Sequence, residues 1–203
     1  MSALPPERPL AHVYDAAYAG VPNWDIGRPQ RPFVHLVETG YVREPVLDLG
    51  CGTGELSLFL ARQGFDVLGI DISPAAIRQS REKARWRRID AAFLVWDALY
   101  LDRLADAGFA FRTVLDSAMY HVLTAEERDR LVDGLGEVVR SGGRYCVLGD
   151  ARTDDRSGYG ITPGEVGARF ESTGEWETEF GYRTVFERRH SSNPAYFVGL
   201  RRR

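Results

Sequence analysis

The pattern of apolar and polar positions along the chain predicts an alternation of strands and helices. Short runs made almost wholly of apolar residues predict buried strands at 46–49, 65–71 and 91–96. Stretches with apolar residues three or four positions apart follow the first two runs and predict amphipathic helices. Buried strands that alternate with helices indicate an α/β sheet with parallel pairing and right-handed crossovers.

Two more buried strands are predicted at 111–116 and 144–149, with a helix between them. Thr124 and Glu127 have the spacing of a capping box, which opens this helix, and the glycine pair within 141–143 is expected to end it.

In the last third of the chain the spacing of apolar and polar residues changes again. A polar, glycine-bearing stretch at 150–160 is expected to be a mobile loop, and a second capping box opens a short helix at 162–171. Residues alternate at 176–180, 183–189 and 195–202, which predicts strands, the last two as an antiparallel pair.

The chain as a whole, 1–203, is expected to form one domain. Residues 1–40 are expected to form a helical cap on the core at 41–203. Within the cap, helices are expected at 10–19 and 32–40, with a turn-rich stretch between them.

Composition narrows the class of protein. Of 203 residues, 44% are hydrophobic and 27% are charged, which is ordinary for a globular domain. No apolar run approaches the roughly 18 residues of a membrane span, and the N-terminus lacks the pattern of a signal peptide, so a cytoplasmic protein is expected.

The net charge of −3 argues against nucleic acid as the main partner. Cys51 and Cys146 are too few for a disulfide framework or a zinc site, and packing roles are expected.

The stretch VLDLGCGTGELSLF at 46–59 carries the strongest chemical signal. Gly50, Gly52 and Gly54 allow left-handed torsions and let the backbone approach a ligand closely. The Lys and Ser/Thr that follow the last glycine of a P-loop are absent, and the spacing differs from the G-x-G-x-x-G of dinucleotide folds. Asp48 precedes the loop and suits a ligand with an ammonium group. The loop therefore predicts a cofactor site.

Two more carboxylates stand at the ends of predicted strands. Asp71 lies about twenty residues beyond the loop, the interval at which Rossmann-type folds present a carboxylate to ribose hydroxyls. Ser73 and Pro74 already supply an N-cap and a first-turn proline, so capping does not explain Asp71. Asp97 ends the third strand, and such carboxylates face the ligand crevice of open α/β sheets.

These residues together resemble the motifs of class I S-adenosylmethionine-dependent methyltransferases. The resemblance implies an α/β fold with a Rossmann-like seven-stranded mixed sheet, mostly parallel with an antiparallel last strand, and helices on both faces. It implies S-adenosylmethionine as the cofactor, with its methionine moiety over the glycine turn and its adenine amino group on Asp97. The residues expected to bind it are Asp48, Gly50, Cys51, Gly52, Asp71, Ile72, Asp97, Ala98, Asp116 and Trp24.

The N-terminal string YDAAYAG, followed by NWDIGRPQ, resembles the small-molecule subgroup that includes thiopurine and thiol methyltransferases. In that subgroup the segment before the first motif folds over the cofactor and helps to close the acceptor pocket. We therefore expect a thiol, thiopurine-like, phenolic or heteroaromatic acceptor, and a monomer or homodimer. Trp24 is expected either to pack against the sulfonium or the acceptor ring, or to fill the edge of the core.

The sequence DSAMYH at 116–121 follows the fourth strand, where the resemblance places the transferred methyl group. His121 is the candidate general base, because an ordinary pKa of about 6.5 suits proton removal at neutral pH. Tyr120 is the candidate for orienting or stacking an acceptor ring. A hydrogen-bonded structural histidine is the other interpretation of His121. No His, Asp and Glu cluster has metal-ligand spacing, so no metal is expected.

Arg78, Arg81, Arg85 and Arg88 recur along one face of the helix predicted after Ser73. We interpret them as a solvated face; the alternative is a phosphate-binding stripe of a nucleic-acid or protein methyltransferase. The stretch after the fourth strand lacks the N/D-P-P-Y/F motif of amino-methylating nucleic-acid enzymes. A non-catalytic protein that binds S-adenosylmethionine is the third hypothesis.

Overall fold

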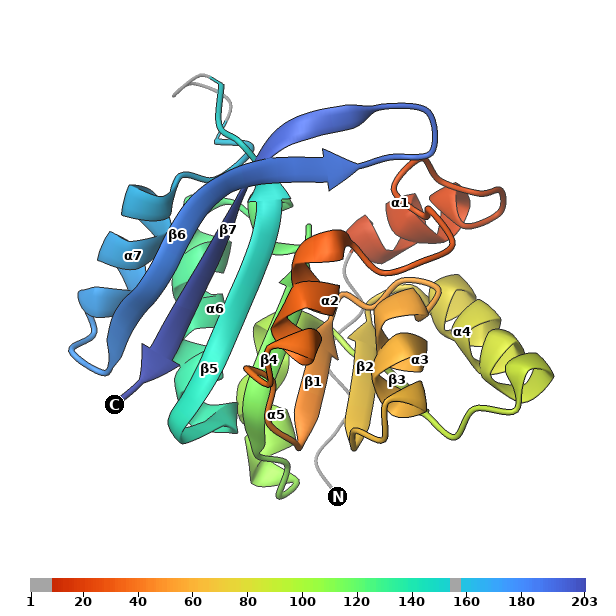
Figure 1. The fold of residues 1–203 in the computed structure, drawn as a ribbon, viewed down its shortest axis with the longest axis horizontal. Coiled ribbons are helices and arrows are strands. Elements are labelled where there is room, and N and C mark those ends of the chain that lie inside the picture. Colours follow the sequence, from red (N-terminus) through yellow and green to blue (C-terminus); the bar gives the residue numbers. More distant parts are fainter. Residues whose placement is uncertain (1–8, 154–157) are drawn as a thin grey trace.

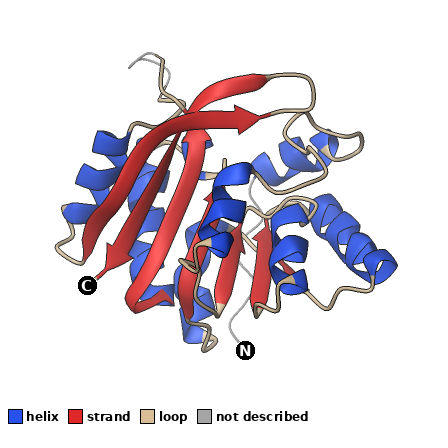
Figure 2. Cartoon of the chain, viewed as in Figure 1, coloured by secondary structure: helices blue, strands red, loops and turns tan. Residues whose placement is uncertain are grey.

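One seven-stranded sheet runs through the protein, with helices on both faces (Figures 1 and 2). The computed structural model describes residues 9–153 and 158–203. Its strand order is β3-β2-β1-β4-β5-β7-β6, with parallel pairing from β3 to β5 and antiparallel pairing of β7 with both of its neighbours. The predicted Rossmann-like mixed sheet is confirmed.

The strands of the sheet are β1 (Val46–Leu49), β2 (Val67–Asp71), β3 (Ala92–Val95), β4 (Phe111–Ser117), β5 (Val139–Asp150), β6 (Trp176–Glu187) and β7 (Ser192–Arg202). The α-helices of the described residues are α1 (Pro9–Ala17), α2 (Arg31–Glu38), α3 (Glu55–Arg62), α4 (Pro74–Arg87), α5 (Leu101–Asp106), α6 (Ala125–Val138) and α7 (Pro163–Glu171). Short 3-10 helices are η1 (Ala98–Tyr100) and η2 (Tyr120–Val122).

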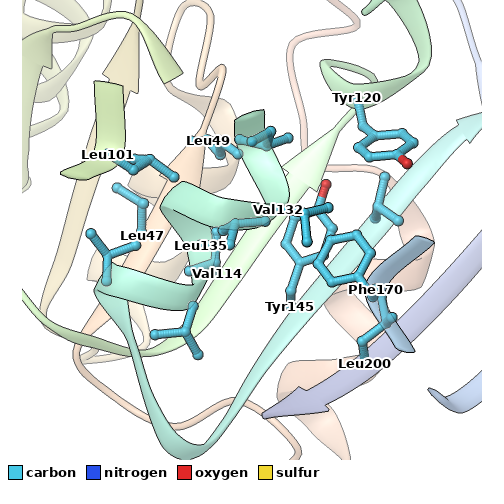
Figure 3. Packing of buried hydrophobic residues seen from close by; sticks show 14 of the residues in the cluster. Leu47, Leu49, Leu101, Val114, Tyr120, Val132, Leu135, Tyr145, Phe170 and Leu200 are labelled. Carbon is cyan, nitrogen blue, oxygen red and sulfur yellow. The ribbon is translucent and has the colours of Figure 1, made fainter. Parts of the chain in front are cut away.

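The central strands are almost wholly apolar because both faces of the sheet are covered. Leu47 and Leu49 of β1 face the layer of α5, α6 and α7, where they belong to one core cluster with Leu101 and Leu135 (Figure 3). Val46 faces the other layer and packs in the cluster of α2 and α3. Burial of each such side chain stabilises the fold by about 1.5–3 kcal/mol, so the two clusters fix the strands in register.

Parallel pairing brings the carboxyl ends of β1, β2, β3 and β4 to one edge of the sheet. In Figure 1, α1 and the segment that follows it lie across this edge. Asp15 of α1 anchors them there, because its Oδ1 accepts the backbone N–H of Ala75 at 2.9 Å and the hydroxyl of Ser73. The N-terminal segment is thereby fixed to the start of α4, over the region where a ligand would bind.

Three local predictions differ from the structure. The strands predicted at 176–180 and 183–189 are one strand, β6, because Gly181 does not turn but packs so closely on α7 that a Cβ there would lie 2.9 Å from Cβ of Pro163. The helix that was expected to reach 141–143 ends at Val138, since β5 already begins at Val139. The short helix α5 was not predicted. The capping box of Thr124 and Glu127 is confirmed.

Candidate active site

A cavity of about 370 Å³ opens at the carboxyl edge of β1, β2 and β4. Its walls come from the glycine loop, the ends of β2 and β3, the turn after β4, the N-terminal segment and the end of β6. The predicted residues Asp48, Gly50, Cys51, Gly52, Asp71, Ile72, Asp97, Ala98, Trp24 and His121 all line it. Residues far apart in the sequence, such as Trp24 and His121, thus share one site.

The glycine loop forms one wall, and its backbone leaves no room for side chains. Gly50 has φ +70° and Gly52 has φ +54°, in the left-handed region that favours glycine. A Cβ on Gly50 would lie 2.9 Å from Cβ of Met119, and one on Gly52 would lie 2.8 Å from the hydroxyl of Tyr18. Glycine is therefore required both for the torsion and for the close approach.

Asp71 ties this loop to the end of β2. Its Oδ2 accepts the N–H of Gly52 at 2.8 Å, and its Oδ1 accepts the N–H of Ser73 at 2.8 Å. A carboxylate oxygen has two lone-pair sites, so each oxygen keeps one for a ligand hydroxyl. Ser73 caps α4 with its own side chain, which accepts the N–H of Ala76 at 3.1 Å. Asp71 is therefore positioned for a ligand as well as for the turn.

Asp48 is a buried carboxylate at the floor of the cavity. It is 1% exposed, and its Oδ2 accepts the hydroxyl of Ser57 at 2.6 Å. Burial raises the pKa of Asp48 to about 7, although the hydrogen bond donated by Ser57 by itself lowers this pKa. No cationic side chain pairs with it among the described residues. A ligand with a positive charge would supply the missing counter-charge.

Asp97 stands at the end of β3 with its Oδ1 bound to the N–H of Leu99 at 3.0 Å. Ile72, Ala98 and Leu99 line the cavity beside it. The indole of Trp96 also reaches the cavity, with its Nε1 donating to the carbonyl of Tyr100 at 3.0 Å. This end of the cavity combines one carboxylate with apolar walls, which suits a flat heterocycle that carries an amino group.

Trp24 lies in an aromatic corner on the N-terminal side. Its Nε1 donates to the hydroxyl of Tyr18 at 3.2 Å, and its ring meets those of Tyr14 and Tyr18 edge to face at 6.3 and 6.2 Å. Both tyrosines line the cavity, although neither was predicted as a site residue. Trp24 packs in a core cluster, as one of its two expected roles requires, and it also borders the cavity.

The opposite end of the cavity is built around His121. Its imidazole is 4% exposed, and Nδ1 accepts the backbone N–H of Asp150 at 2.9 Å. The ring centroid lies 4.9 Å from that of Tyr159 and 6.3 Å from that of Phe186. Burial lowers the pKa of His121 to about 4, and Arg188 contributes in the same direction. The imidazole is thus neutral at physiological pH.

Asp150 connects the segments of this end. Its Oδ2 accepts the hydroxyl of Tyr159 at 2.5 Å, Nη2 of Arg188 at 2.5 Å and Nδ2 of Asn193 at 3.1 Å. Tyr159, Phe186 and Arg188 line the cavity, and sequence reasoning missed all three. Their segments were predicted as a loop and a strand, but no local pattern indicates that they meet His121.

Two predicted site residues lie outside the cavity. Asp116 is fully buried, and it accepts the hydroxyl of Tyr145 at 2.8 Å and the N–H of Met119 at 2.8 Å. It pairs with Leu49 in register and so faces the α6 layer, whereas Asp48 faces the opposite side. Its position is structural: it holds the turn after β4.

Tyr120 is also fully buried, in the core beside Phe170 (Figure 3). Its hydroxyl donates to Oε1 of Glu165 at 3.3 Å, and the guanidinium of Arg128 lies 4.8 Å from its ring centroid. A residue in this position packs the core and does not touch a ligand in the cavity. Tyr120 is therefore not placed to orient an acceptor.

The arginine stripe lies elsewhere. Arg78, Arg81 and Arg85 are exposed on α4, and Arg88 is exposed directly after it. The four line a separate shallow groove with Glu82 and Asp90. Arg81 already makes a hydrogen bond within the protein, because its Nη2 donates to the carbonyl of Phe93 at 2.6 Å. None of the four lines the main cavity.

Between 9 and 153 and between 158 and 203, no group of three or more His, Cys, Asp or Glu side chains is arranged to hold a metal ion. No helix in the same ranges has the length and apolar character to cross a membrane.

Comparison with known proteins shows which proteins the chain is similar to. Residues 46–143 match the family model described as a methyltransferase domain. The chain is 29% identical over 147 residues to a 2-heptyl-1-hydroxyquinolin-4(1H)-one methyltransferase of Mycobacteroides abscessus, covering 68% of this chain and 64% of that protein. It is 33% identical over 151 residues to an eEF1A lysine and N-terminal methyltransferase of Mus musculus, covering 66% of this chain and 21% of that protein.

A solved structure from work on the conversion of a disulfide bond into a thioacetal group during echinomycin biosynthesis shares the fold over almost its whole length. The TM-score is 0.83 at 29% identity, with 95% of this chain and 92% of that chain covered. The chain spans less than two thirds of the length of the two curated relatives, but nearly all of this structure.

Proposed function

Because residues 46–143 carry a methyltransferase domain, we propose that this protein moves a methyl group from S-adenosylmethionine to a sulfur, oxygen or nitrogen atom of a small molecule. One observation carries the proposal. A single cavity joins the carboxylates Asp48, Asp71 and Asp97 to the end lined by His121 and Phe186. Such a cavity suits a polar cofactor at one end and a second molecule at the other.

The residues present fit the cofactor. Asp71 offers free lone pairs to the ribose hydroxyls, Asp97 offers an acceptor to the adenine amino group, and the unpaired Asp48 offers a counter-charge to the methionine ammonium. Gly50 and Gly52 leave the space that a Cβ would fill. When bound, S-adenosylmethionine supplies a methyl group already activated by the positive charge on sulfur.

The protein's own contribution is alignment and exclusion of water. Trp24 of the N-terminal segment and Phe186 of β6 both border the cavity, and they provide apolar contact for an acceptor ring. Attack in line with the leaving sulfur requires the acceptor atom to be held close to the methyl carbon in a dry pocket. Met119 lines the same cavity and packs against the glycine loop, where its Cβ leaves no room for a side chain at Gly50.

Two relatives support a small acceptor. The Mycobacteroides relative is named for an N-hydroxyquinolone, and the echinomycin-related structure concerns sulfur chemistry and matches along 92% of its chain. Membership of the thiopurine and thiol subgroup remains our proposal. A monomer or homodimer in the cytoplasm is likewise a proposal.

A protein acceptor is the competing proposal, because the Mus musculus relative is named for lysine and N-terminal methylation. The chain matches only 21% of that relative, so the rest of it is not represented here. A nucleic-acid acceptor has less support, since the arginine stripe lies away from the cavity. A non-catalytic cofactor-binding protein would keep the carboxylate end but need no acceptor end.

Transfer of labelled methyl groups tests these proposals together. The panel contains aryl thiols, thiopurines, phenols, N-hydroxyquinolones, bulk protein and bulk RNA. Label on a small molecule supports the leading proposal, and label only on protein or RNA replaces it. If nothing is labelled while S-adenosylhomocysteine still raises the melting temperature, the protein binds the cofactor without turning over this panel.

A further inference from the structure

The tautomer of His121 is fixed by the backbone. Its Nδ1 accepts the N–H of Asp150 at 2.9 Å, and a ring nitrogen that accepts a bond holds its lone pair there. The neutral imidazole therefore carries its proton on Nε2. Within 9–153 and 158–203, no group accepts a hydrogen bond from Nε2, and the ring lines the cavity. Nε2 is thus a donor available to a ligand.

The groups around the ring oppose its protonation. Arg128 of α6 donates through Nη2 to the carbonyl of His121 at 3.3 Å, and Arg188 after β6 lies at the same end of the cavity. The carboxylate of Asp150 in β5 favours protonation of the ring, but it already accepts hydrogen bonds from Arg188 and from the hydroxyl of Tyr159. Protonation would also break the bond from the N–H of Asp150, because Nδ1 is the only free lone pair of the ring.

We infer that Nε2–H of His121 donates a hydrogen bond to an acceptor that has already lost its proton, and that His121 orients this acceptor instead of deprotonating it. The inference rests on the proposed function. A lone pair of the acceptor anion forms the bond to the methyl carbon, the bond from that carbon to the sulfonium sulfur breaks, and its electron pair stays on sulfur. One negative and one positive charge cancel, so no proton has to move.

This geometry selects a chemical class of acceptor. Aryl thiols and N-hydroxy heteroaromatics ionise near or below neutral pH without help, and their anions accept a hydrogen bond at or beside the nucleophilic atom. The flat rings of such compounds suit a wall made by Trp24, Met119 and Phe186. Aliphatic alcohols, which stay protonated at neutral pH, require a base that a donor at Nε2 does not supply.

The dependence of kcat/KM on pH tests the inference with the unmodified protein. The probes are 4-nitrothiophenol, thiophenol and benzyl mercaptan, whose thiol pKa values rise in that order. If each acceptor arrives ionised, the midpoint of the rising limb moves with the pKa of the thiol. A midpoint that stays the same for all three acceptors overturns the inference, because it then belongs to a group of the protein. Absence of methylation of every probe counts against the proposed function, and not against the tautomer.

Substitutions at His121 separate a donor from a base. His121→Gln keeps an N–H near the position of Nε2 but has no basic nitrogen, whereas His121→Leu has neither. We expect His121→Gln to retain most of the kcat with 4-nitrothiophenol, and His121→Leu to lose roughly tenfold to a hundredfold, the loss of a hydrogen bond to a charged group. Equal loss in both variants, with the melting temperature and S-adenosylhomocysteine affinity unchanged, contradicts a donor role.

Discussion

The carboxylate of Asp71 accepts the backbone N–H of Gly52 at 2.8 Å, and this bond joins the end of β2 to the glycine loop. The two residues are 19 positions apart. Because of this bond, the number of residues between the glycine loop and the carboxylate is a useful sign of a ligand site in the sequence. It holds the loop in the one shape in which its backbone and the carboxylate face the same ligand.

Asp71→Asn should weaken binding of S-adenosylhomocysteine by about 1–3 kcal/mol, because charged hydrogen bonds to the ribose are lost. Isothermal titration calorimetry measures this directly. Asp66→Asn is the matched control, since Asp66 precedes the same strand but is exposed at its other end. Equal affinity of Asp71→Asn and the unmodified protein would remove Asp71 from the cofactor site.

Gly52→Ala should abolish measurable cofactor binding, because the new Cβ would meet the hydroxyl of Tyr18 at 2.8 Å in addition to the cost of a positive φ. Tyr18→Phe in the same chain removes the obstructing oxygen and should restore part of the affinity. Gly64→Ala is the control for torsion alone, since Gly64 has φ +89° and nothing within 4 Å. Its cost should be only about 1–2 kcal/mol of stability, seen by denaturant unfolding.

Arg85→Glu combined with Arg88→Glu should leave small-molecule turnover unchanged. Both side chains are exposed on the groove of α4 and neither lines the cavity. The charge reversal removes a phosphate-binding surface if one exists, so binding of RNA is measured beside turnover. A loss of methyl transfer to RNA in this variant would favour the nucleic-acid alternative over the small-molecule proposal.

The end of the cavity with Asp48, Asp71 and Asp97 was predictable from sequence because each of its parts is local. Asp48, Gly52, Asp71 and Asp97 stand at strand ends, and parallel pairing alone brings strand ends together. Asp116 was predicted by the same reasoning, but the alternation of side chains along β4 turns it to the α6 layer. A difference of one residue in register thus separates a ligand-facing carboxylate from a structural one.

At the other end of the cavity only His121 was predicted, because the contacts of its neighbours span the sequence. Tyr159 and Arg188 reach Asp150 from a loop and from beyond β6, and no periodicity relates them to His121. The continuity of β6 was missed for a similar reason. Glycine at 181 suggests a turn, but Gly181 pairs with Val198 of β7 and lies against Pro163, so it belongs inside the strand.

Arg128→Met should impair use of the acceptor while leaving cofactor affinity intact. Arg128 is 2% exposed, and its Nη2 donates to the carbonyls of His121, Gly158 and Gly160 at 3.3, 3.0 and 3.0 Å. It therefore holds the His121 turn against the segment that carries Tyr159. We expect KM for the acceptor to rise and kcat to fall, with the calorimetric affinity for S-adenosylhomocysteine unchanged.

Arg169→Met is the matched control for this prediction. Arg128 and Arg169 both pair with Glu165, at 3.4 and 3.1 Å. The other partners of Arg169 among the described residues are the carbonyl of Ala125 and the carboxylate of Asp129, so it does not hold the His121 turn. Arg169→Met should therefore lower the stability of the protein slightly without raising KM for the acceptor. Similar kinetic defects in both variants would show that loss of the Glu165 interactions, and not release of the cavity wall, limits turnover.

The stability of the ligand-free protein should fall as pH rises from about 4 to 7. Burial raises the pKa of Asp48 to about 7 and that of Asp71 to about 6, from ordinary values of 3.8. The folded state then binds more protons than the unfolded chain across this window, so the free energy of unfolding decreases with pH. Each unit of displaced pKa corresponds to about 1.4 kcal/mol.

The cofactor should reverse part of this loss, because its ammonium group favours the ionised form of Asp48. The rise in melting temperature caused by saturating S-adenosylhomocysteine is therefore expected to be larger at pH 8 than at pH 6, and Asp48→Asn should reduce this difference. Asp116, whose pKa burial raises to about 7, lies outside the cavity and should contribute to the ligand-free slope alone. A ligand-induced shift that is the same at both pH values would show that Asp48 does not meet the positive charge.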